Sequence, residues 1–215
     1  MKAADAKTDG YTLGRWASFY DLSALTGMRA RGVLNTFPPK PGERVLDVGC
    51  GTGTLALMLE KAVGETGTVV AVDAAAKMIR VTQRKAARQA REIDCKVAAI
   101  EELPFEDKSF DSVYSTFMTH HLPIAVKQAG FKEILRVLKP GGGYYIVDFG
   151  AAKSLFWRIV FWLPQLTHAD SLAPHVRGEL PRYLEDAGFV DVNAARRSLG
   201  LIDYVVAKKT VEKRK

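Results

Sequence analysis

The sequence predicts an α/β protein with a Rossmann-like, doubly wound sheet of seven strands, mostly parallel with one antiparallel strand, and an N-terminal helical arm. From residue 43 onward, short apolar runs alternate with segments of helical spacing, which is typical of a parallel sheet covered on both faces. A turn with three glycines follows the first apolar run, as in folds that bind a ligand at strand ends. Two strand-like runs close together near the end of the chain predict an antiparallel pair.

The chain is expected to form one globular domain, since 215 residues can build one full core. Residues 1–42 are expected to form a helical arm or lid, and residues 43–215 the ligand-binding domain, with a substrate-side insertion at 151–176. Within the arm, residues 11–37 have helical spacing, and Gly27 is a candidate break between two helices.

The remaining elements follow from apolar periodicity and from glycine and proline punctuation. Pro140 and the three glycines after it are expected to stop a helix and form a turn before the fifth strand. The expected strands are 44–48, 68–72, 94–98, 110–115, 144–149, 189–193 and 201–207, and the expected helices are 52–63, 76–91, 124–138 and 177–187.

The glycine turn carries the first functional prediction. Asp47 ends the first strand, and Gly49, Gly51 and Gly53 follow it before a helix begins. Glycine allows a left-handed backbone or a close approach to a ligand, and the helix start offers free N–H groups. Asp73 ends the next strand about 20 residues past the last glycine, where a carboxylate can accept both hydroxyls of a ribose. One nucleoside-type cofactor is therefore expected across two adjacent strand ends.

Six segments in this order resemble the class I S-adenosylmethionine-dependent methyltransferases, and particularly the group that contains the ubiquinone/menaquinone C-methyltransferases. They are Val-Leu-Asp-Val-Gly-Cys-Gly-Thr-Gly (45–53), Val-Val-Ala-Val-Asp (69–73), the stretch 101–113 that begins Glu-Glu-Leu-Pro-Phe, His-His-Leu (120–122), the stretch 133–142 that ends Lys-Pro-Gly-Gly, and Leu-Glu-Asp-Ala-Gly-Phe (184–189). The resemblance covers roughly residues 43 to 208 and implies S-adenosyl-L-methionine as the cofactor.

The resemblance also implies a role for each matching position. The methionine half of the cofactor would face Asp47 and the glycine loop, in which Cys50 lies, and Asp73 would bind the ribose. The adenine would contact Ala74 and Met78, with Ile100 and Glu101 at its edge, and Thr116 would lie near the methyl group. Relatives usually carry an Asp or Asn at the position of Ala99, so one hydrogen bond to the adenine is expected to be missing here. Tyr11 and Tyr20 are lid candidates from the arm.

His120 and His121 are the candidate catalytic residues, with Tyr20 as a third. They follow the fourth strand, at the cleft where the strand order is expected to reverse. Adjacent side chains of an extended segment point in opposite directions, so only one histidine is expected to face the site. A histidine there can remove a proton near neutral pH, and the alternative is that both only pack or cap.

Composition and charge limit which partners and which cellular compartment we expect for the protein. Lys and Arg number 31 against 24 Asp and Glu, a net charge of +7, with basic clusters at 77–91 and at the end of the chain. The clusters favour either a solvated surface or an anionic membrane surface; nucleic acid is not expected, because no aromatic residues interleave with them. The two cysteines are far apart and no signal peptide is visible, so a cytoplasmic location is expected. If the basic clusters bind a membrane surface, the protein would be peripheral at the membrane. His168, Asp170 and His175 are poor evidence for a metal, and none is expected.

The predicted function is methyl transfer from S-adenosylmethionine to a small, apolar-bodied acceptor: a quinone-precursor ring, a phenolic or carboxyl oxygen, or a phospholipid amine. The aromatic segment 156–163 favours an apolar pocket or an interfacial helix, with a buried core helix as the alternative. Two alternatives stay open. One is a non-catalytic module that binds the same cofactor, and the other is an NAD-dependent reductase, for which residues 51–56 and the pair Tyr204 and Lys208 offer weak motif matches.

Overall fold

The computed structural model describes residues 24–153, 157, 159 and 171–211. Seven strands form one sheet in the order β3-β2-β1-β4-β5-β7-β6. The strands are β1 (Arg44–Val48), β2 (Thr68–Asp73), β3 (Asp94–Val97), β4 (Phe110–Thr116), β5 (Leu138–Phe149), β6 (Val190–Ser198) and β7 (Ile202–Lys208). Only β7 runs antiparallel to its neighbours, so the predicted fold class is confirmed.

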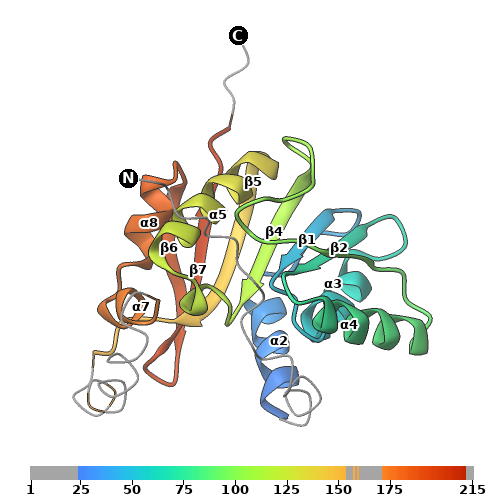
Figure 1. Cartoon of the computed structure of the whole chain (residues 1–215), viewed down its shortest axis with the longest axis horizontal. Helices are drawn as coiled ribbons and strands as arrows, with labels where there is room; N and C mark the ends of the chain where they lie inside the picture. Colours follow the sequence, from blue (N-terminus) through green and yellow to red (C-terminus); the bar gives the residue numbers. More distant parts are fainter. Residues whose placement is uncertain (1–23, 154–156, 158, 160–170, 212–215) are drawn as a thin grey trace.

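Helices cover both faces of this sheet, as Figure 1 shows. One face carries α2 (Ala24–Thr36), α3 (Thr54–Val63) and α4 (Ala76–Arg88), whose apolar residues share a core with β1, β2 and β7. The other face carries α5 (Ile124–Val137) and α8 (Leu180–Asp186), which pack on the alternate residues of the same strands. A short 3-10 helix, η2 (Thr119–His121), and α7 (Ala173–Arg177) complete the described helices.

Three details of the sequence prediction are wrong. Helix α2 continues through Gly27 without a break. The segment predicted as a helix at 177–187 begins at Leu180, because Gly178 has a left-handed backbone (φ +79°) that ends α7 first. The three glycines after Pro140 lie inside β5, which starts directly after α5 at Leu138.

The glycines of β5 allow the strand to pass close to β4. A Cβ on Gly142 would lie 2.8 Å from the Asp111 carbonyl oxygen, so a side chain there would separate the two backbones. The register between β4 and β5 shifts at this point, from Phe110 opposite Leu138 to Ser112 opposite Gly143. A bulge of this kind replaces the predicted turn, and the strand resumes regular pairing toward Phe149.

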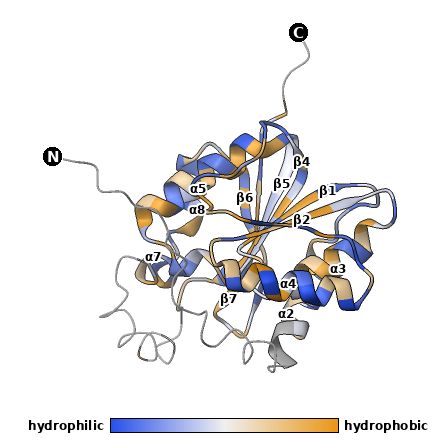
Figure 2. Ribbon diagram, turned by 45° about the vertical axis from the view of Figure 1, so that its right-hand side comes forward, coloured by the Kyte–Doolittle hydropathy of each residue, from blue (hydrophilic) through white to orange (hydrophobic). Residues whose placement is uncertain are grey.

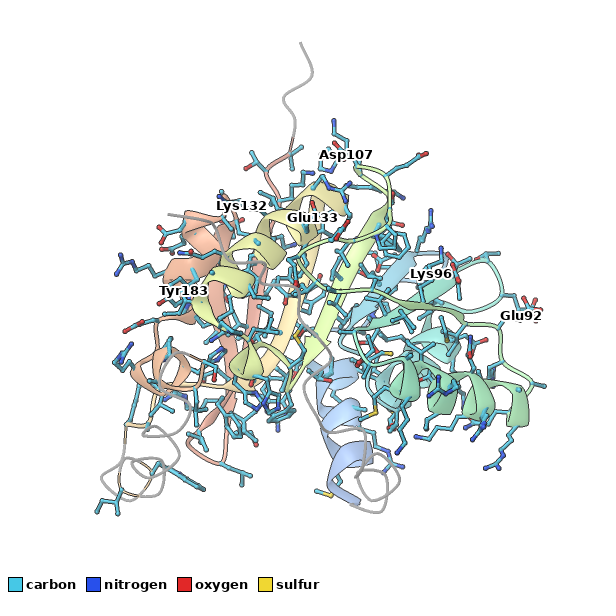
Figure 3. All side chains as sticks on the ribbon, viewed as in Figure 1. Glu92, Lys96, Asp107, Lys132, Glu133 and Tyr183 are labelled. Atoms are coloured by element: carbon cyan, nitrogen blue, oxygen red, sulfur yellow. The ribbon has the colours of Figure 1, made fainter. Side chains whose placement is uncertain are left out.

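Arg136 at the end of α5 ties the segment between β3 and β4 to that helix. Its guanidinium bonds both oxygens of Glu133 at 2.8 Å, Asp107 at 2.8 Å and the carbonyl oxygens of Leu103 and Phe105. Glu133 in turn accepts the Leu103 N–H at 3.0 Å. Figure 3 labels Glu133 and Asp107, which lie close together at this end of α5. The network holds the segment between β3 and β4 in place.

The start of the described chain is tied to the sheet through Tyr114 of β4. Its phenolic O–H donates to the Phe37 carbonyl oxygen at 2.9 Å, and Tyr114 and Phe37 both pack on the Tyr145 ring. Tyr204 of β7 packs against Gly32 of α2, where a Cβ would meet its hydroxyl at 2.5 Å. Tyr204 is therefore occupied in packing, and Lys208 is exposed at the far end of the same strand, so the two do not form a reductase pair.

Candidate active site

The parallel strands end at one edge of the sheet, and two groups of polar residues gather there. The first group follows β1 and β2 and contains the glycine loop. The second group follows β4 and β5 and contains His120. The strand order reverses between β1 and β4, so the two groups lie on either side of the point where α/β folds bind ligands.

The glycine loop is held by backbone hydrogen bonds from its neighbours. The N–H groups of Gly49 and Cys50 donate to the Val72 carbonyl at 2.8 and 3.0 Å. The Gly51 N–H donates to Asp73 at 2.9 Å, and the Gly51 carbonyl accepts from the Thr82 hydroxyl at 3.0 Å. The loop is thus fixed before any ligand arrives.

All three loop glycines have a left-handed backbone, with φ of +72°, +54° and +77° at Gly49, Gly51 and Gly53. A Cβ on Gly49 would strike the Met118 side chain, and one on Gly53 would strike Thr82. A Cβ on Gly51 would meet nothing within 4 Å among the residues that the structure describes. The loop therefore leaves open space at Gly51 and is packed against side chains at Gly49 and Gly53.

Asp47 is fully buried beneath this loop. Neither carboxylate oxygen has a hydrogen-bond partner among the described residues. Burial and, to a smaller extent, the negative charge of Asp73 raise the pKa of Asp47 to about 7, and the nearby Ala56 N–H acts in part against that rise. A buried carboxylate without a donor is costly unless a ligand brings one.

Asp73 has both oxygens engaged by backbone donors, Gly51 N–H on one and Ala75 N–H on the other, each at 2.9 Å. Burial raises its pKa, and these two N–H groups act against that rise. A carboxylate has about four acceptor positions, so two remain for hydroxyl donors of a ligand. Ala74 and Met78 follow it at the start of α4, with Met78 buried and Ala74 half-buried.

The other residues predicted to contact the cofactor differ in burial, and one of them packs in the core. Cys50 is buried, with its thiol 4.0 Å from the Thr82 hydroxyl, and burial raises the pKa of that thiol. The Ile100 side chain packs against Gly130 of α5, so its side chain belongs to the core. Glu101 and Thr116 are half-buried beyond β3 and at the end of β4. Tyr11 and Tyr20 lie outside the described residues, as do His168 and Asp170.

His120 is the histidine that faces inward. Its Nδ1 lies 2.6 Å from Oδ1 of Asp148, which is buried in β5, while His121 is exposed and packs its ring against His120 at 3.9 Å between centroids. Because a carboxylate only accepts, Nδ1 carries a proton, and in the neutral form of the ring Nε2 keeps its lone pair. Nε2 has no hydrogen bond to a described residue, so it can accept a proton from a ligand.

The Asp148 carboxylate is itself held by three further donors. The Thr119 hydroxyl donates to Oδ2 at 2.6 Å, the backbone N–H of His120 donates to the same oxygen at 3.2 Å, and the backbone N–H of Phe149 donates to Oδ1 at 2.8 Å. Burial alone would raise the pKa of Asp148, but the His120 charge and the hydrogen bonds from His120 and Thr119 outweigh it and hold that pKa well below the usual range. Asp148 therefore stays ionised and orients the imidazole.

Asp148 and Thr119 were not predicted from the sequence. Asp148 is the only acid in β5 and follows the apolar residues Ile146 and Val147, near the same edge as Asp47 and Asp73, and that position was the available signal. His175, considered only as a metal ligand, lies 3.5 Å from the Thr119 hydroxyl. Among the described residues there is no cluster of three or more metal-ligating side chains, and no helix is both long and apolar enough to cross a membrane.

Comparison with known proteins adds to this geometry. A family model described as a methyltransferase domain matches residues 45–142. A demethylmenaquinone methyltransferase of Staphylococcus aureus (strain JH9) is 32% identical over 183 residues, which cover 74% of this chain and 73% of that protein. Both similarities are in sequence, and the matched family model covers the glycine loop, the two histidines and β5 as far as its bulge.

Solved structures show the same fold. A SAM dependent methyltransferase from Aquifex aeolicus superposes with a TM-score of 0.71 at 24% identity, over 91% of this chain and 97% of that one. Phosphoethanolamine N-methyltransferase 2 from Haemonchus contortus, solved with S-adenosyl-L-methionine, superposes with a TM-score of 0.71 at 17% identity, over 94% of this chain and 59% of that one.

Proposed function

Because the chain belongs to the class I S-adenosylmethionine-dependent methyltransferases, we propose that it methylates a small, apolar-bodied acceptor at an oxygen or carbon that loses a proton. S-adenosylmethionine is the cofactor, and it supplies an activated methyl group when bound. The acceptor class is the part proposed here, and the observation that carries it is the His120–Asp148 pair.

The residues of the glycine loop fit this cofactor. Its methionine part carries an ammonium, and Asp47 is a buried carboxylate that lacks a donor. Its ribose carries two hydroxyls, and Asp73 keeps acceptor positions beside the two backbone donors. The open surface at Gly51 allows close approach of a ligand to the backbone. We therefore assign Asp47, Asp73 and the loop backbone to cofactor binding.

His120 would act as the general base. Its free Nε2 can accept the proton that the acceptor loses while the acceptor electron pair forms the new bond to the methyl carbon. The bound cofactor would supply the methyl group and keep the electron pair of its sulfur–carbon bond, and Asp148 would stabilise the resulting imidazolium of His120. A neutral amine is nucleophilic before it loses a proton, so this pair favours a hydroxyl or an acidic carbon over the phospholipid amine.

A hydroxylated aromatic ring satisfies both requirements, since its O–H is acidic and its deprotonated form is nucleophilic at oxygen and at ring carbon. The relative at 32% identity is named for a demethylated menaquinone, which supports a quinol-type acceptor. The predicted insertion 151–176 supports the same location for the acceptor, because His175 within it lies 3.5 Å from the Thr119 hydroxyl, which donates to Asp148.

The test is turnover with labelled S-adenosylmethionine and two short-chain naphthoquinols, one with a free ring position and one already methylated there. Transfer to the first alone supports the proposal. His120→Gln is expected to lower kcat at least 100-fold, the usual contribution of a general base, while S-adenosylhomocysteine binds as before. Cofactor binding without turnover on any acidic acceptor would favour a non-catalytic module, and nicotinamide binding that S-adenosylmethionine does not displace would favour a reductase.

We also propose that α4 meets an anionic membrane surface. The helix contains five basic residues and no acid, and its outer side is hydrophilic in Figure 2. Lys77, Arg80, Arg84 and Arg88 are exposed at helical spacing, and none forms an ion pair with a described residue. Each basic residue near such a surface contributes roughly 1 kcal/mol.

Sedimentation with phosphatidylglycerol vesicles tests this contact. The double variant R80Q/R84Q is expected to bind about 30-fold more weakly than the parent, from roughly 2 kcal/mol lost. The matched control is K132Q/R182Q, which removes two exposed charges from α5 and α8. Equal losses in the two variants, or equal binding to phosphatidylcholine vesicles, would contradict a role for α4.

A further inference from the structure

The hairpin between β6 and β7 carries an unusual residue at its tip, which comprises residues 198–201. The Ser198 carbonyl accepts the Leu201 N–H at 3.1 Å, which closes a turn with Leu199 and Gly200 at its centre. Both central residues have a left-handed backbone, with φ of +53° and +68°. Two-residue turns of this kind favour Asn or Asp followed by Gly, and a bulky apolar residue is strained at the first position.

Leu199 gains no burial within the described chain that would offset this strain. It is 75% exposed, the highest value among the exposed large apolar residues that the structure describes. A single exposed leucine is ordinary, but an exposed leucine held in a strained backbone is not. The combination points to a contact outside the described chain.

The tip lies at the edge of the sheet that carries the candidate site. Phe149 at the end of β5 pairs with Ile202 at the start of β7, and the Gly150 N–H donates to the Leu201 carbonyl at 2.6 Å. Figure 1 shows the hairpin, α7 and the start of α2 on the lower side of the molecule, where β4 and β5 end.

Two further apolar side chains project from neighbouring elements. Met28, near the start of α2, is 63% exposed, and Ile159 is 64% exposed. Trp157, two residues before Ile159, packs against the small core that contains Leu201, so this segment is attached beside the hairpin. Apolar protrusions therefore come from α2, from residue 159 and from the hairpin tip.

Basic residues accompany these protrusions. Arg31 is exposed one turn after Met28 in α2, and Lys153 is exposed after β5. Helix α4, with five basic residues and no acid, lies below β1 and β2 in both Figure 1 and Figure 2. Basic residues beside apolar side chains that project into solvent are typical of a protein that lies on an anionic lipid surface.

A second copy of the chain fits this side less well than lipid does. A two-fold contact through it would bring α4 toward its own copy, where like charges repel. A stable protein interface also needs roughly 800 Å² of well-packed surface on each partner. The apolar residues here stand on separate elements, and separate side chains can each enter lipid.

We propose that the β6–β7 hairpin is a membrane-docking element, in which Leu199 enters the hydrocarbon of an anionic bilayer. The docked protein would turn the sheet edge that carries His120 toward the lipid, so that an apolar-bodied acceptor reaches the site without crossing water. The inference rests on the proposed contact of α4 for its choice of partner. It adds an apolar contact and an orientation, which can be measured separately from that contact.

Leu199→Asn separates stability from membrane binding. Asn suits this turn, so the melting temperature should rise by about 2–4 °C as the backbone strain is relieved. Sedimentation with phosphatidylglycerol vesicles should show about tenfold weaker binding, because the burial of one leucine side chain in hydrocarbon is lost. Salt does not screen an apolar contact, so this ratio should be the same at low and high salt, whereas the loss in R80Q/R84Q should shrink as salt rises.

Val211→Asn is the matched control. Val211 is exposed and lies against Gly141, near the start of β5 and at the opposite edge of the sheet. This variant should bind vesicles as the parent does. Equal losses in the two variants, or unchanged binding of Leu199→Asn, would overturn the proposal.

Two further measurements identify a different occupant of the tip. A dimer of the parent that becomes a monomer in Leu199→Asn, observed by sedimentation velocity, would assign the tip to a second copy and overturn the proposal. A lower melting temperature of Leu199→Asn would show that another part of this chain covers Leu199, with the same consequence. Weak binding of Leu199→Asn beside normal binding of R80Q/R84Q would refute the contact of α4 and support the hairpin, and the converse would refute the hairpin alone.

Discussion

Replacement of Asp47 by Asn should change how stability depends on pH. The buried carboxylate has a pKa of about 7 in the folded protein against an ordinary value of 3.8. The folded state therefore holds a proton that the unfolded state has lost, and stability falls as pH rises from about 4 to about 7. Asn has nearly the same shape and no charge, so the variant lacks this decline.

The magnitude follows from the same two values. One pH unit corresponds to about 1.4 kcal/mol, so the full difference is about 4 kcal/mol, of which about 3 kcal/mol falls between pH 5 and pH 8. Asn leaves a buried amide without a partner, which costs roughly 1–3 kcal/mol at every pH. The absolute stability of the variant is therefore less informative than its slope with pH.

The assay is urea unfolding of parent and variant at five pH values from 5 to 8, without cofactor. The free energy of unfolding of the parent should fall by about 3 kcal/mol more than that of Asp47→Asn over this range. Asp186→Asn, at an exposed position of α8, is the control and should follow the parent. Equal slopes in parent and Asp47→Asn would refute the reasoning.

Three other predictions concern single contacts. Gly51→Ala should cost only about 1–2 kcal/mol of stability, because its backbone has a φ of +54°, but it should weaken S-adenosylhomocysteine binding in calorimetry. Gly53→Ala should lower the melting temperature more than Gly51→Ala does, because its Cβ would strike Thr82. The reverse order of melting temperatures would contradict the open space at Gly51. Tyr114→Phe should destabilise the protein by about 1–2 kcal/mol in urea unfolding, because the Phe37 carbonyl loses its buried donor; an unchanged midpoint would argue against that hydrogen bond. Arg136→Lys should cost roughly 1–3 kcal/mol, since an ammonium cannot bond Glu133 in two places while it holds the neighbouring loop, and a neutral result by the same assay would show that the network is dispensable.

The cofactor side of the site was predictable from the sequence, because its chemistry lies in local patterns. Asp47 and Asp73 each lie at the end of an apolar run. The glycines between them mark a turn whose left-handed backbone other residues rarely adopt. In the structure both acids lie at neighbouring strand ends, and Asp73 accepts a hydrogen bond from the Gly51 N–H of the loop. Their roles toward the cofactor remain predictions until binding is measured.

The acceptor side was predictable only in part, because its contacts join residues far apart in the chain. His120 was recognised from its position after β4, but its partner Asp148 is 28 residues away and becomes a partner only when β4 and β5 pair. The start of β5 was also missed, since glycines signal turns locally and signal close strand contact only when the neighbouring strand is known.

The reversal of strand order between β1 and β4 separates the two groups of residues to which we assign different tasks. Under the proposed function, donor recognition would come from the half of the sheet that holds β1 and β2, and acceptor chemistry from the half that begins at β4. No residue of the proposed site serves both tasks, so exchange of residues after β4 and β5 would change the acceptor while the donor site is preserved. A chain with this arrangement is a favourable starting point for altered methylation chemistry, and chimeras of two methyltransferases are best joined between α4 and β4.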